Sequence, residues 1–263
     1  MTAMARMTGM ARMTQMARLT QMVALLTVIF FPGPIPSPIP SPIPSPIANL
    51  VPSLSPCQLA EALIMPYGAV PDPGSEWIYT SNLGRAKVTI EEAGKTDHQY
   101  RWRMLVAGLS YEEELQLSTD RICAVEKTFG AFHIFHDQFV YKEGELVMEL
   151  PLEVGKSWSW QGFVEHGSKV YPARASGQVV ERRTISVPAG SFDVFVIKME
   201  RSDDMGTRQE MLIYFDPDNG VIKGEGSLLW RGLIGRIQQI VGFTRLEVTL
   251  EKINVVISGR TSP

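Results

Sequence analysis

From Trp77 onward, polar and apolar residues alternate in short runs, and this pattern constrains the fold more than any other feature of the chain. The alternation is clearest over residues 100–104, 192–199 and 246–253. Side chains of a β-strand point alternately to its two faces, so these runs predict strands that bury one face and leave the other in water. Such strands are typical of antiparallel sheets.

Turn-forming residues separate the runs. They are Lys142-Glu-Gly144, Pro188-Ala-Gly190, Asp203-Asp-Met-Gly206 and Asp216-Pro-Asp-Asn-Gly220. Proline presets φ, glycine accepts positive φ, and aspartate bonds to the nearby backbone, so each segment predicts a reversal between two strands. About fourteen short strands follow, too many for one flat sheet. The sequence therefore predicts an all-β domain, an antiparallel meander curled into an open barrel or folded as a β-sandwich.

Residues 230–241 depart from this pattern, because their apolar residues recur at the spacing of a helix. Trp230, Leu233, Ile234 and Ile237 share one side, although Gly232 and Gly235 weaken helix formation. Three interpretations remain: a helix packed on the sheet as core, a mobile lid or membrane-touching helix, and an irregular strand.

The first 31 residues are predicted to be a targeting segment rather than a folded unit. A six-residue repeat rich in Met and Arg leads to the uncharged apolar run of residues 19–31. A basic flank before a short apolar run is the layout of an export signal, and the run is short for a permanent membrane span. No Ala-x-Ala site follows it. Export signal, membrane tether and buried helix are the three interpretations.

Residues 32–64 hold more than half of the chain's 18 prolines. Alternating proline excludes helix and removes sheet donors, which predicts an extended polyproline II linker. A protein that recognises proline-rich segments is an alternative reading. Residues 65–258 then form the single β domain, and 259–263 are a tail.

Composition excludes several classes of protein. The chain has 263 residues and a net charge of −3, which argues against a nucleic-acid binder. Two cysteines are too few for a disulfide-rich scaffold. Cys57 follows Leu54-Ser-Pro, which is similar to a lipid-attachment box except for Pro56. A lipidated Cys57, a free thiol and a Cys57–Cys123 disulfide are the three alternatives.

Three segments carry a resemblance: Leu150-Pro-Leu-Glu-Val-Gly-Lys-Ser-Trp158-Ser-Trp160, Ile185-Ser-Val-Pro-Ala-Gly-Ser-Phe192-Asp-Val-Phe195 and Tyr214-Phe-Asp-Pro-Asp-Asn-Gly220-Val-Ile-Lys223. Together they resemble an uncharacterised family of bacterial exported or lipoprotein-like β proteins with W-x-Y, V-P-A-G-x-F and G-x-V-K motifs. Glu76-Trp77-Ile-Tyr79 is similar to a weaker copy of the first motif. The resemblance implies an extracytoplasmic β fold and no particular activity.

Motifs of known enzymes are missing from the sequence: it has no Gly-x-Ser-x-Gly elbow, phosphate-binding glycine loop or His-Glu-x-x-His helix. His133 and His136 would point to opposite faces of a strand. The carboxylates of Glu112-Glu113-Glu114 and Asp203-Asp204 are interpreted as a solvated face or a protected strand edge, with a surface cation site as the alternative. We expect no metal, cofactor or catalytic residue, although carboxylates paired across strands would be invisible in one sequence.

The leading hypothesis is a non-catalytic domain of the cell envelope that binds a lipid or another apolar or amphipathic ligand. Its ligand would lie on the concave face of the curled sheet, lined by the five tryptophans Trp77, Trp102, Trp158, Trp160 and Trp230. The membrane would be contacted through the N-terminal segment. Two alternatives remain: a structural or protein-interaction module with an envelope partner and no small ligand, and an unrecognised hydrolase.

Overall fold

The computed structural model describes residues 73–92, 99–131, 135–229, 235 and 244–254. These residues form twelve β-strands. In chain order the strands are β1 Glu76–Ser81, β2 Gly84–Glu92, β3 Gln99–Val106, β4 Leu109–Leu117, β5 Arg121–Ala131, β6 Phe135–Glu149, β7 Ser157–His166, β8 Lys169–Val187, β9 Gly190–Asp203, β10 Arg208–Asp216, β11 Gly220–Leu229 and β12 Arg245–Asn254.

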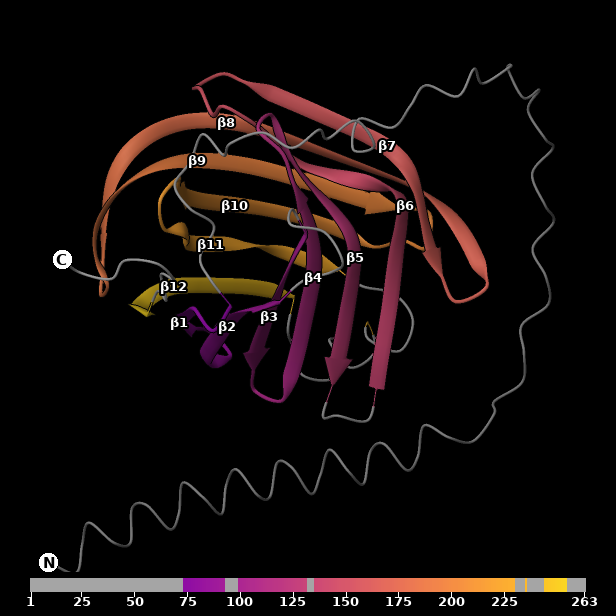
Figure 1. Ribbon diagram of the computed structural model, residues 1–263, viewed down its shortest axis with the longest axis horizontal. Coiled ribbons are helices and arrows are strands. Elements are labelled where there is room, and N and C mark those ends of the chain that lie inside the picture. Colours follow the sequence, from indigo (N-terminus) through magenta and orange to yellow (C-terminus); the bar gives the residue numbers. More distant parts are fainter. Residues whose placement is uncertain (1–72, 93–98, 132–134, 230–234, 236–243, 255–263) are drawn as a thin grey trace, which may run out of the picture. The chain divides into compact units, whose positions relative to one another are not determined.

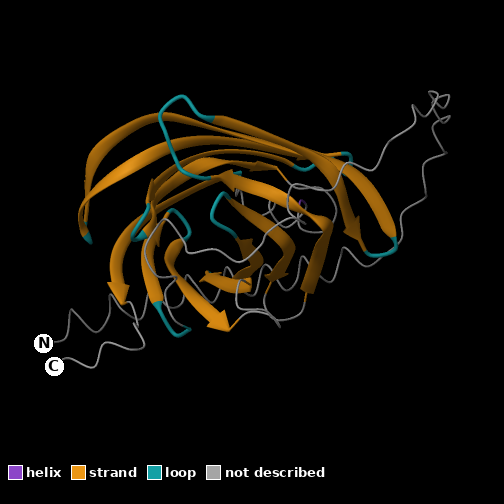
Figure 2. Cartoon of the chain, turned by 45° about the horizontal axis from the view of Figure 1, so that its top comes forward, coloured by secondary structure: helices purple, strands orange, loops and turns teal. Residues whose placement is uncertain are grey.

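Each strand pairs antiparallel with its neighbours in the chain, and β1 pairs with β12 to close a barrel (Figures 1 and 2). The predicted all-β antiparallel meander is confirmed, and it is a closed barrel rather than an open one or a sandwich. The residues of the predicted helix over 230–241 lie outside the described part of the chain, apart from Gly235. The segments predicted to be an N-terminal signal or tether, a proline-rich linker and a tail also lie outside it.

Two predicted turns show why local chemistry is enough for some reversals. Pro188 and Ala189 join β8 to β9 directly, with Val187 paired to Gly190. In the turn between β10 and β11, one carboxylate oxygen of Asp216 accepts hydrogen bonds from the backbone N–H groups of Asp218 and Asn219, each at 2.9 Å. Gly220 ends that turn with a φ of +82°, a conformation that glycine adopts without strain.

The predicted turn at Lys142-Glu-Gly144 is wrong, because these residues lie within β6. The register against β5 slides from the pair Ala124↔Glu145 to the pair Glu126↔Val140. The extra residues of β6 are therefore held in a bulge, with Gly144 at a φ of +72°. This bulge merges two of the predicted strands into one and turns the side chain of Glu145 into the protein, where it is buried.

Strand pairing around the barrel is uneven. Between β6 and β7 only the pairs Phe139↔His166 and Val140↔Glu165 form, although both strands are longer than this. In contrast, β8 and β9 pair along almost their whole length and arch over the barrel (Figure 1). The backbone N–H of Ala189, at the tip of this hairpin, donates to the carbonyl of Leu250 in β12 at 3.4 Å.

Buried apolar side chains form two clusters. The first gathers around Trp158, Trp160, Val179 and Ile197 and includes buried residues of β5 to β9. The second gathers around Trp77, Tyr79, Ile222 and Leu250, where the two ends of the meander meet. The barrel is thus held by apolar packing on two sides of its interior.

Candidate functional site

Register identifies the face of the sheet that points into the barrel. Residues opposite one another in an antiparallel pair share a face. The pairs Trp102↔Glu113, Glu113↔Lys127, Lys127↔Phe139 and Phe139↔His166 carry one face from β3 to β7. The outer positions between them, such as Glu112 and Glu114, hold ion pairs with Arg103 and Arg101.

The same face continues along β7, β8 and β9 through the pairs Trp160↔Ala175 and Ala175↔Arg201. The side chain of Arg201 then bonds to Glu145 of β6, across a span of two intervening strands. A contact between non-neighbouring strands of a barrel must cross its interior, so this face is the inner one.

One part of the inner face is tightly filled, and we call it the packed wall. Its members are Trp158, Trp160 and Val164 of β7 with Ala173, Ala175, Gly177 and Val179 of β8, all buried. The Trp158 ring lies over Gly177, where an added Cβ would be 2.2 Å from Cζ2 of the ring. The Trp160 ring lies over Gly162 in the same way, at 2.3 Å. In the packed wall, large tryptophan rings thus lie over glycines, which have no side chain to displace them.

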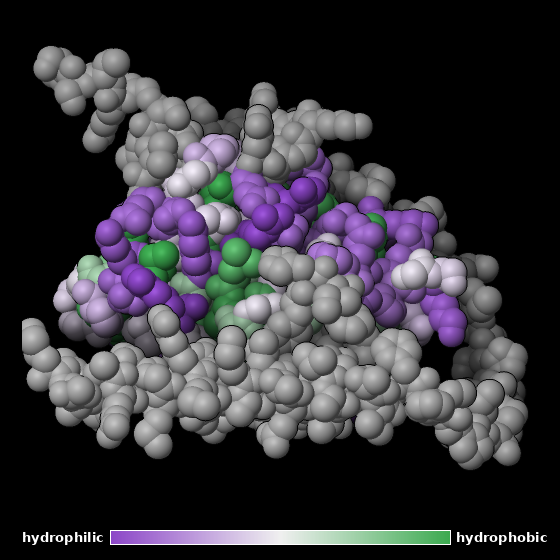
Figure 3. Space-filling model, turned by 90° about the horizontal axis from the view of Figure 1, so that it is seen from below, coloured by the Kyte–Doolittle hydropathy of each residue, from purple (hydrophilic) through white to green (hydrophobic). Residues whose placement is uncertain are grey.

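A second part of the inner face, which we call the aromatic wall, consists of Trp102 and Met104 of β3, Tyr111 of β4 and Phe129 of β5. Their rings form a continuous row, with centroid separations of 5.0 Å from Trp102 to Tyr111 and 4.5 Å from Tyr111 to Phe129. All four side chains are only half-buried although they point into a closed barrel. Seen from below, apolar residues also come to the surface in the middle of the described part, beside hydrophilic ones (Figure 3).

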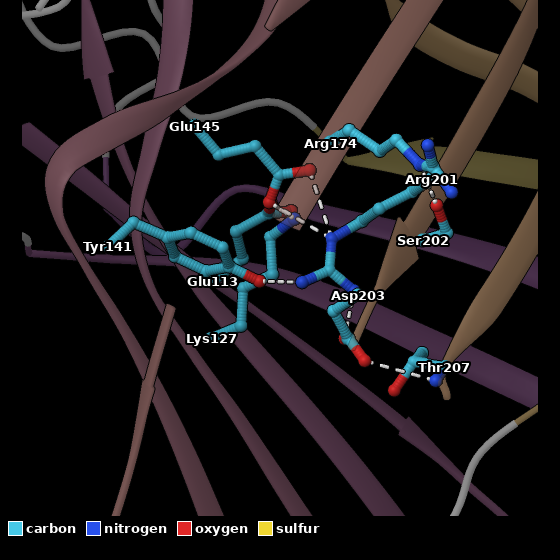
Figure 4. A network of polar contacts seen from close by, with 9 residues as sticks. All are labelled: Glu113, Lys127, Tyr141, Glu145, Arg174, Arg201, Ser202, Asp203 and Thr207. Atoms are coloured by element: carbon cyan, nitrogen blue, oxygen red, sulfur yellow. Dashed lines mark hydrogen bonds and ion pairs between the residues drawn. The ribbon is translucent and has the colours of Figure 1, made fainter. Parts of the chain in front are cut away.

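A network of charged residues and one tyrosine also lies on the inner face (Figure 4). This ionic cluster consists of Glu113 of β4, Lys127 of β5, Tyr141 and Glu145 of β6, and Arg201 and Asp203 of β9. Lys127 Nζ lies 2.7 Å from Glu145 Oε2 and 3.4 Å from Glu113 Oε1. Arg201 Nε donates to Glu145 Oε1 at 3.0 Å, and Arg201 also donates to the hydroxyl of Tyr141. Glu145 therefore connects Lys127 of β5 with Arg201 of β9.

Burial and charge act in opposite directions on the two glutamates. Burial raises the pKa of Glu113, with a further increase from Glu145, and Lys127 does not fully offset it. Burial also opposes ionisation of Glu145, but Lys127 and Arg201 outweigh it and hold its pKa below the ordinary value. Burial raises the pKa of Tyr111 and of Tyr141, so both phenols stay protonated. Glu145 is the ionised centre of the cluster.

The structure places four of the five predicted ligand-lining tryptophans in the barrel, and Trp230 lies outside the described residues. Trp158 and Trp160 belong to the packed wall, and Trp77 belongs to the second apolar cluster. The indole N–H of Trp158 donates to the carbonyl of Val147 at 2.9 Å, and that of Trp77 to the carbonyl of Asn219 at 3.0 Å. Trp102, in contrast, belongs to the half-buried aromatic wall.

The interpretation of Glu112-Glu113-Glu114 and Asp203-Asp204 as a solvated face is wrong for two of the five carboxylates. Glu113 and Asp203 are buried in the ionic cluster, and only their neighbours point outward. The sequence did contain a signal for the burial of Glu113. It lies two residues from Tyr111 and two from Leu115, so in a strand all three side chains point to the same face. By the same rule, Arg201 is expected on the face of its strand that carries Ile197 and Met199.

The described residues bring together no group of three or more His, Cys, Asp and Glu side chains able to hold a metal ion. His136 is exposed, and His133 lies outside the described residues. In the same part of the chain, no helix has the length and apolar composition that a membrane crossing requires.

Comparisons with known proteins give no family model and no curated protein that matches the chain. Three solved structures are similar to it. A predicted lipoprotein from Parabacteroides distasonis shares 8% identity with a TM-score of 0.38, covering 73% of this chain and 100% of its own. A predicted exported protein from Bacteroides fragilis, with a YmcC-like fold, shares 10% at a TM-score of 0.38, covering 72% and 99%. The hypothetical lipoprotein YmcC from Escherichia coli shares 13% at 0.36, covering 72% and 85%.

Proposed function

We propose that the chain is a non-catalytic β-barrel protein of the bacterial cell envelope that binds an amphipathic ligand, with the apolar part of that ligand on the aromatic wall. The single observation that carries the proposal is the half-burial of Trp102, Met104, Tyr111 and Phe129 on the inner face of a closed barrel. Side chains of a solid protein interior are close-packed and buried. Half-buried rings on an inner face point to a surface with room for another molecule.

The chemistry of the aromatic wall fits the apolar part of such a ligand. Aromatic side chains bury large areas, and their edges and faces accept alkyl chains without hydrogen-bond demands. Met104 adds a flexible side chain that adapts to the shape of a partner. The hydroxyl of Tyr111, the middle ring of the row, bonds to Glu113 of the ionic cluster. An apolar surface beside a charged cluster matches a molecule with a tail and a head group.

The envelope location rests on two independent observations. One is the apolar run of residues 19–31 behind a basic flank, which has the layout of an export signal. The other is Cys123, which is buried in β5 and disulfide-bonded. Disulfides persist in oxidising compartments and are rare in the cytosol. The chain's second cysteine, Cys57, lies outside the described residues.

Native mass spectrometry of the full chain purified from the envelope fraction tests the binding proposal. We expect an adduct with the mass of a lipid-like molecule on the wild-type chain and a much weaker one on Trp102→Ala. Leu105→Ala is the matched control, because Leu105 lies in the same strand at an exposed position. A wild-type chain that carries no adduct, and binds no added alkyl alcohol, would contradict the proposal.

The location has its own test. Thiol labelling of the denatured, unreduced chain should leave both cysteines unmodified, and labelling should appear only after reduction. Recovery of the chain in the cytosolic fraction with reactive thiols would contradict the envelope location.

A second candidate function is an interaction module with a protein partner, and one observation favours it. On the outer face of the β7–β8 hairpin, Phe163 is 57% exposed and Val170 is 55% exposed. Exposed apolar residues of this kind often mark contact surfaces. Replacing both by serine would abolish capture of an envelope partner while leaving any ligand adduct in place.

A further inference from the structure

Asp203 is the one side chain of the ionic cluster with an unused hydrogen-bonding position among the described residues. Its Oδ1 accepts the backbone N–H of Thr207 at 3.0 Å, which holds the turn between β9 and β10. Its Oδ2 accepts no hydrogen bond from the described residues, and the side chain is 0% exposed. A buried carboxylate oxygen without a donor is costly, so its presence points to a missing donor.

Arg201 does not fill this position. Its Nη1 lies 3.7 Å from Asp203 Oδ2, which is beyond hydrogen-bond distance. Other N–H groups of Arg201 are directed to Glu145 and to the Tyr141 hydroxyl. Arg201 Nη1 therefore forms an ion pair with Asp203 Oδ2 but no hydrogen bond, and Oδ2 remains open to a donor from outside the described residues.

The distribution of charge in the cluster points the same way. Glu145 contacts both cations, Lys127 and Arg201, directly. With a cation, Asp203 has only the 3.7 Å contact of its Oδ2 with Arg201 Nη1 among the described residues, so its charge is less well compensated. A cation beside Asp203 would therefore be stabilised, and an anion there would be repelled.

The position of the cluster connects it to the aromatic wall. Glu113 lies opposite Trp102 in the register and bonds to the hydroxyl of Tyr111. From Glu113, contacts run through Lys127, Glu145 and Arg201 to Asp203. A ligand whose tail lies on the wall and whose chain continues past Glu113 would bring its head group toward Asp203.

From these observations we infer that the head group of the ligand is an ammonium group, and that Asp203 Oδ2 accepts its hydrogen bond. The inference rests on the proposed function, since it concerns the polar end of the same ligand. It names a class of ligand, amphipathic amines, and sets it against fatty acids and phosphorylated lipids, whose head groups are anionic.

Isothermal titration of the full chain with three probes that share one alkyl chain tests this class: decylammonium chloride, sodium decanoate and decanol. Decanol reports on the aromatic wall alone. We expect decylammonium to bind at least about tenfold more tightly than decanol, and decanoate to bind more weakly than decanol.

Asp203→Asn should remove the preference for decylammonium and leave decanol binding unchanged. The amide oxygen of asparagine can still accept the Thr207 N–H, so the turn is preserved. Asp204→Asn is the matched control, because Asp204 is the next residue along the chain and is exposed. If Asp203→Asn fails to fold, the order of the three probes on the wild-type chain still decides the question.

The outcomes separate the two proposals. Equal binding of the three probes, or tighter binding of decanoate, overturns the ammonium inference and leaves the amphipathic ligand standing. Failure of all three probes to bind overturns the proposed function itself. An ammonium preference that survives Asp203→Asn overturns the role of Asp203.

Discussion

The packed wall and the aromatic wall lie on the same inner face of one barrel, and both contain large rings, yet only the rings of the packed wall are fully buried. On the packed wall, Trp158 and Trp160 cover Gly177 and Gly162, so each ring lies flat against its own wall. On the aromatic wall, rings stand beside rings, as in the 5.0 Å edge contact of Trp102 with Tyr111. Alternation of large and small residues fills an interior, whereas rows of large residues leave surface exposed.

The largest effect is expected from removing Glu145, the residue that joins Lys127 to Arg201. Glu145→Ala would leave Lys127 and Arg201 buried without their shared carboxylate, and we expect it to lower the free energy of unfolding by about 3–5 kcal/mol. Urea unfolding of the full chain measures the loss. The control is Glu114→Ala, on the outer face, where the 2.8 Å pair with Arg101 should be worth about 1 kcal/mol or less. Equal losses would show that the ionic cluster is no more than a surface network.

The two walls should respond differently to the same substitution. Trp158→Ala should cost about 3–5 kcal/mol, because it empties a close-packed site. Trp102→Ala should cost about 2 kcal/mol less, because its ring is already partly in water. Thermal unfolding monitored by circular dichroism compares the pair. If both variants lose the same stability, the aromatic wall is packed as well, and the binding proposal loses its basis.

A smaller effect is expected from overfilling the packed wall. Gly177→Ala places a Cβ 2.2 Å from the Trp158 ring, so the ring must move, at a cost of about 1–3 kcal/mol. Near-ultraviolet circular dichroism should report the changed surroundings of the indole. Ser176→Ala, at the next position and on the outer face, is the control and should leave both signals unchanged. An unperturbed Gly177→Ala would mean that the ring has free space beside it.

The smallest effect concerns pH and separates Glu113 from Glu145. Because the pKa of Glu113 is raised above its ordinary value of 4.5, the folded state holds this proton more tightly than the unfolded state. The stability that this proton contributes is fully present below pH 4.5 and is lost as pH rises through the folded-state pKa. Glu113→Gln keeps a neutral side chain among Tyr111, Lys127 and Glu145, so it should gain stability relative to wild type as pH rises.

The contribution of Glu145 has the opposite sign, and the cations that cause it, Lys127 and Arg201, are present in both proteins. Its pKa is lowered, so its stabilisation is present above pH 4.5 and is lost as pH falls, in the variant and in the wild type alike. Urea unfolding at a series of pH values from acid to neutral measures the difference. A difference that stays constant with pH would mean that Glu113 is ionised in the folded barrel throughout.

Local chemistry in the sequence predicted the strands and most of the turns, because alternation, Pro188 and the Asp216 carboxylate act over a few residues. It could not separate a turn from a bulge at Lys142-Glu-Gly144, since that depends on whether β5 continues alongside. The inward position of Glu113 could be predicted from its place two residues after Tyr111. Its charge favoured the solvent-exposed interpretation instead. Nothing local relates Arg201 to Glu145, which lie 56 positions apart and meet only when the barrel closes.

The uneven strand pairing has a mechanical consequence. The barrel is joined firmly where the two ends of the meander meet, from Glu76↔Asn254 to Ser81↔Val248, and weakly in the middle of the chain, by two residue pairs between β6 and β7. Under strain the barrel would open between β6 and β7, while the β1–β12 pair would stay closed. Besides these two pairs, side-chain contacts hold β6 and β7 together, among them the hydrogen bond from the Trp158 indole N–H to the Val147 carbonyl. The two halves of the chain would separate there first, with the ionic cluster just behind the gap.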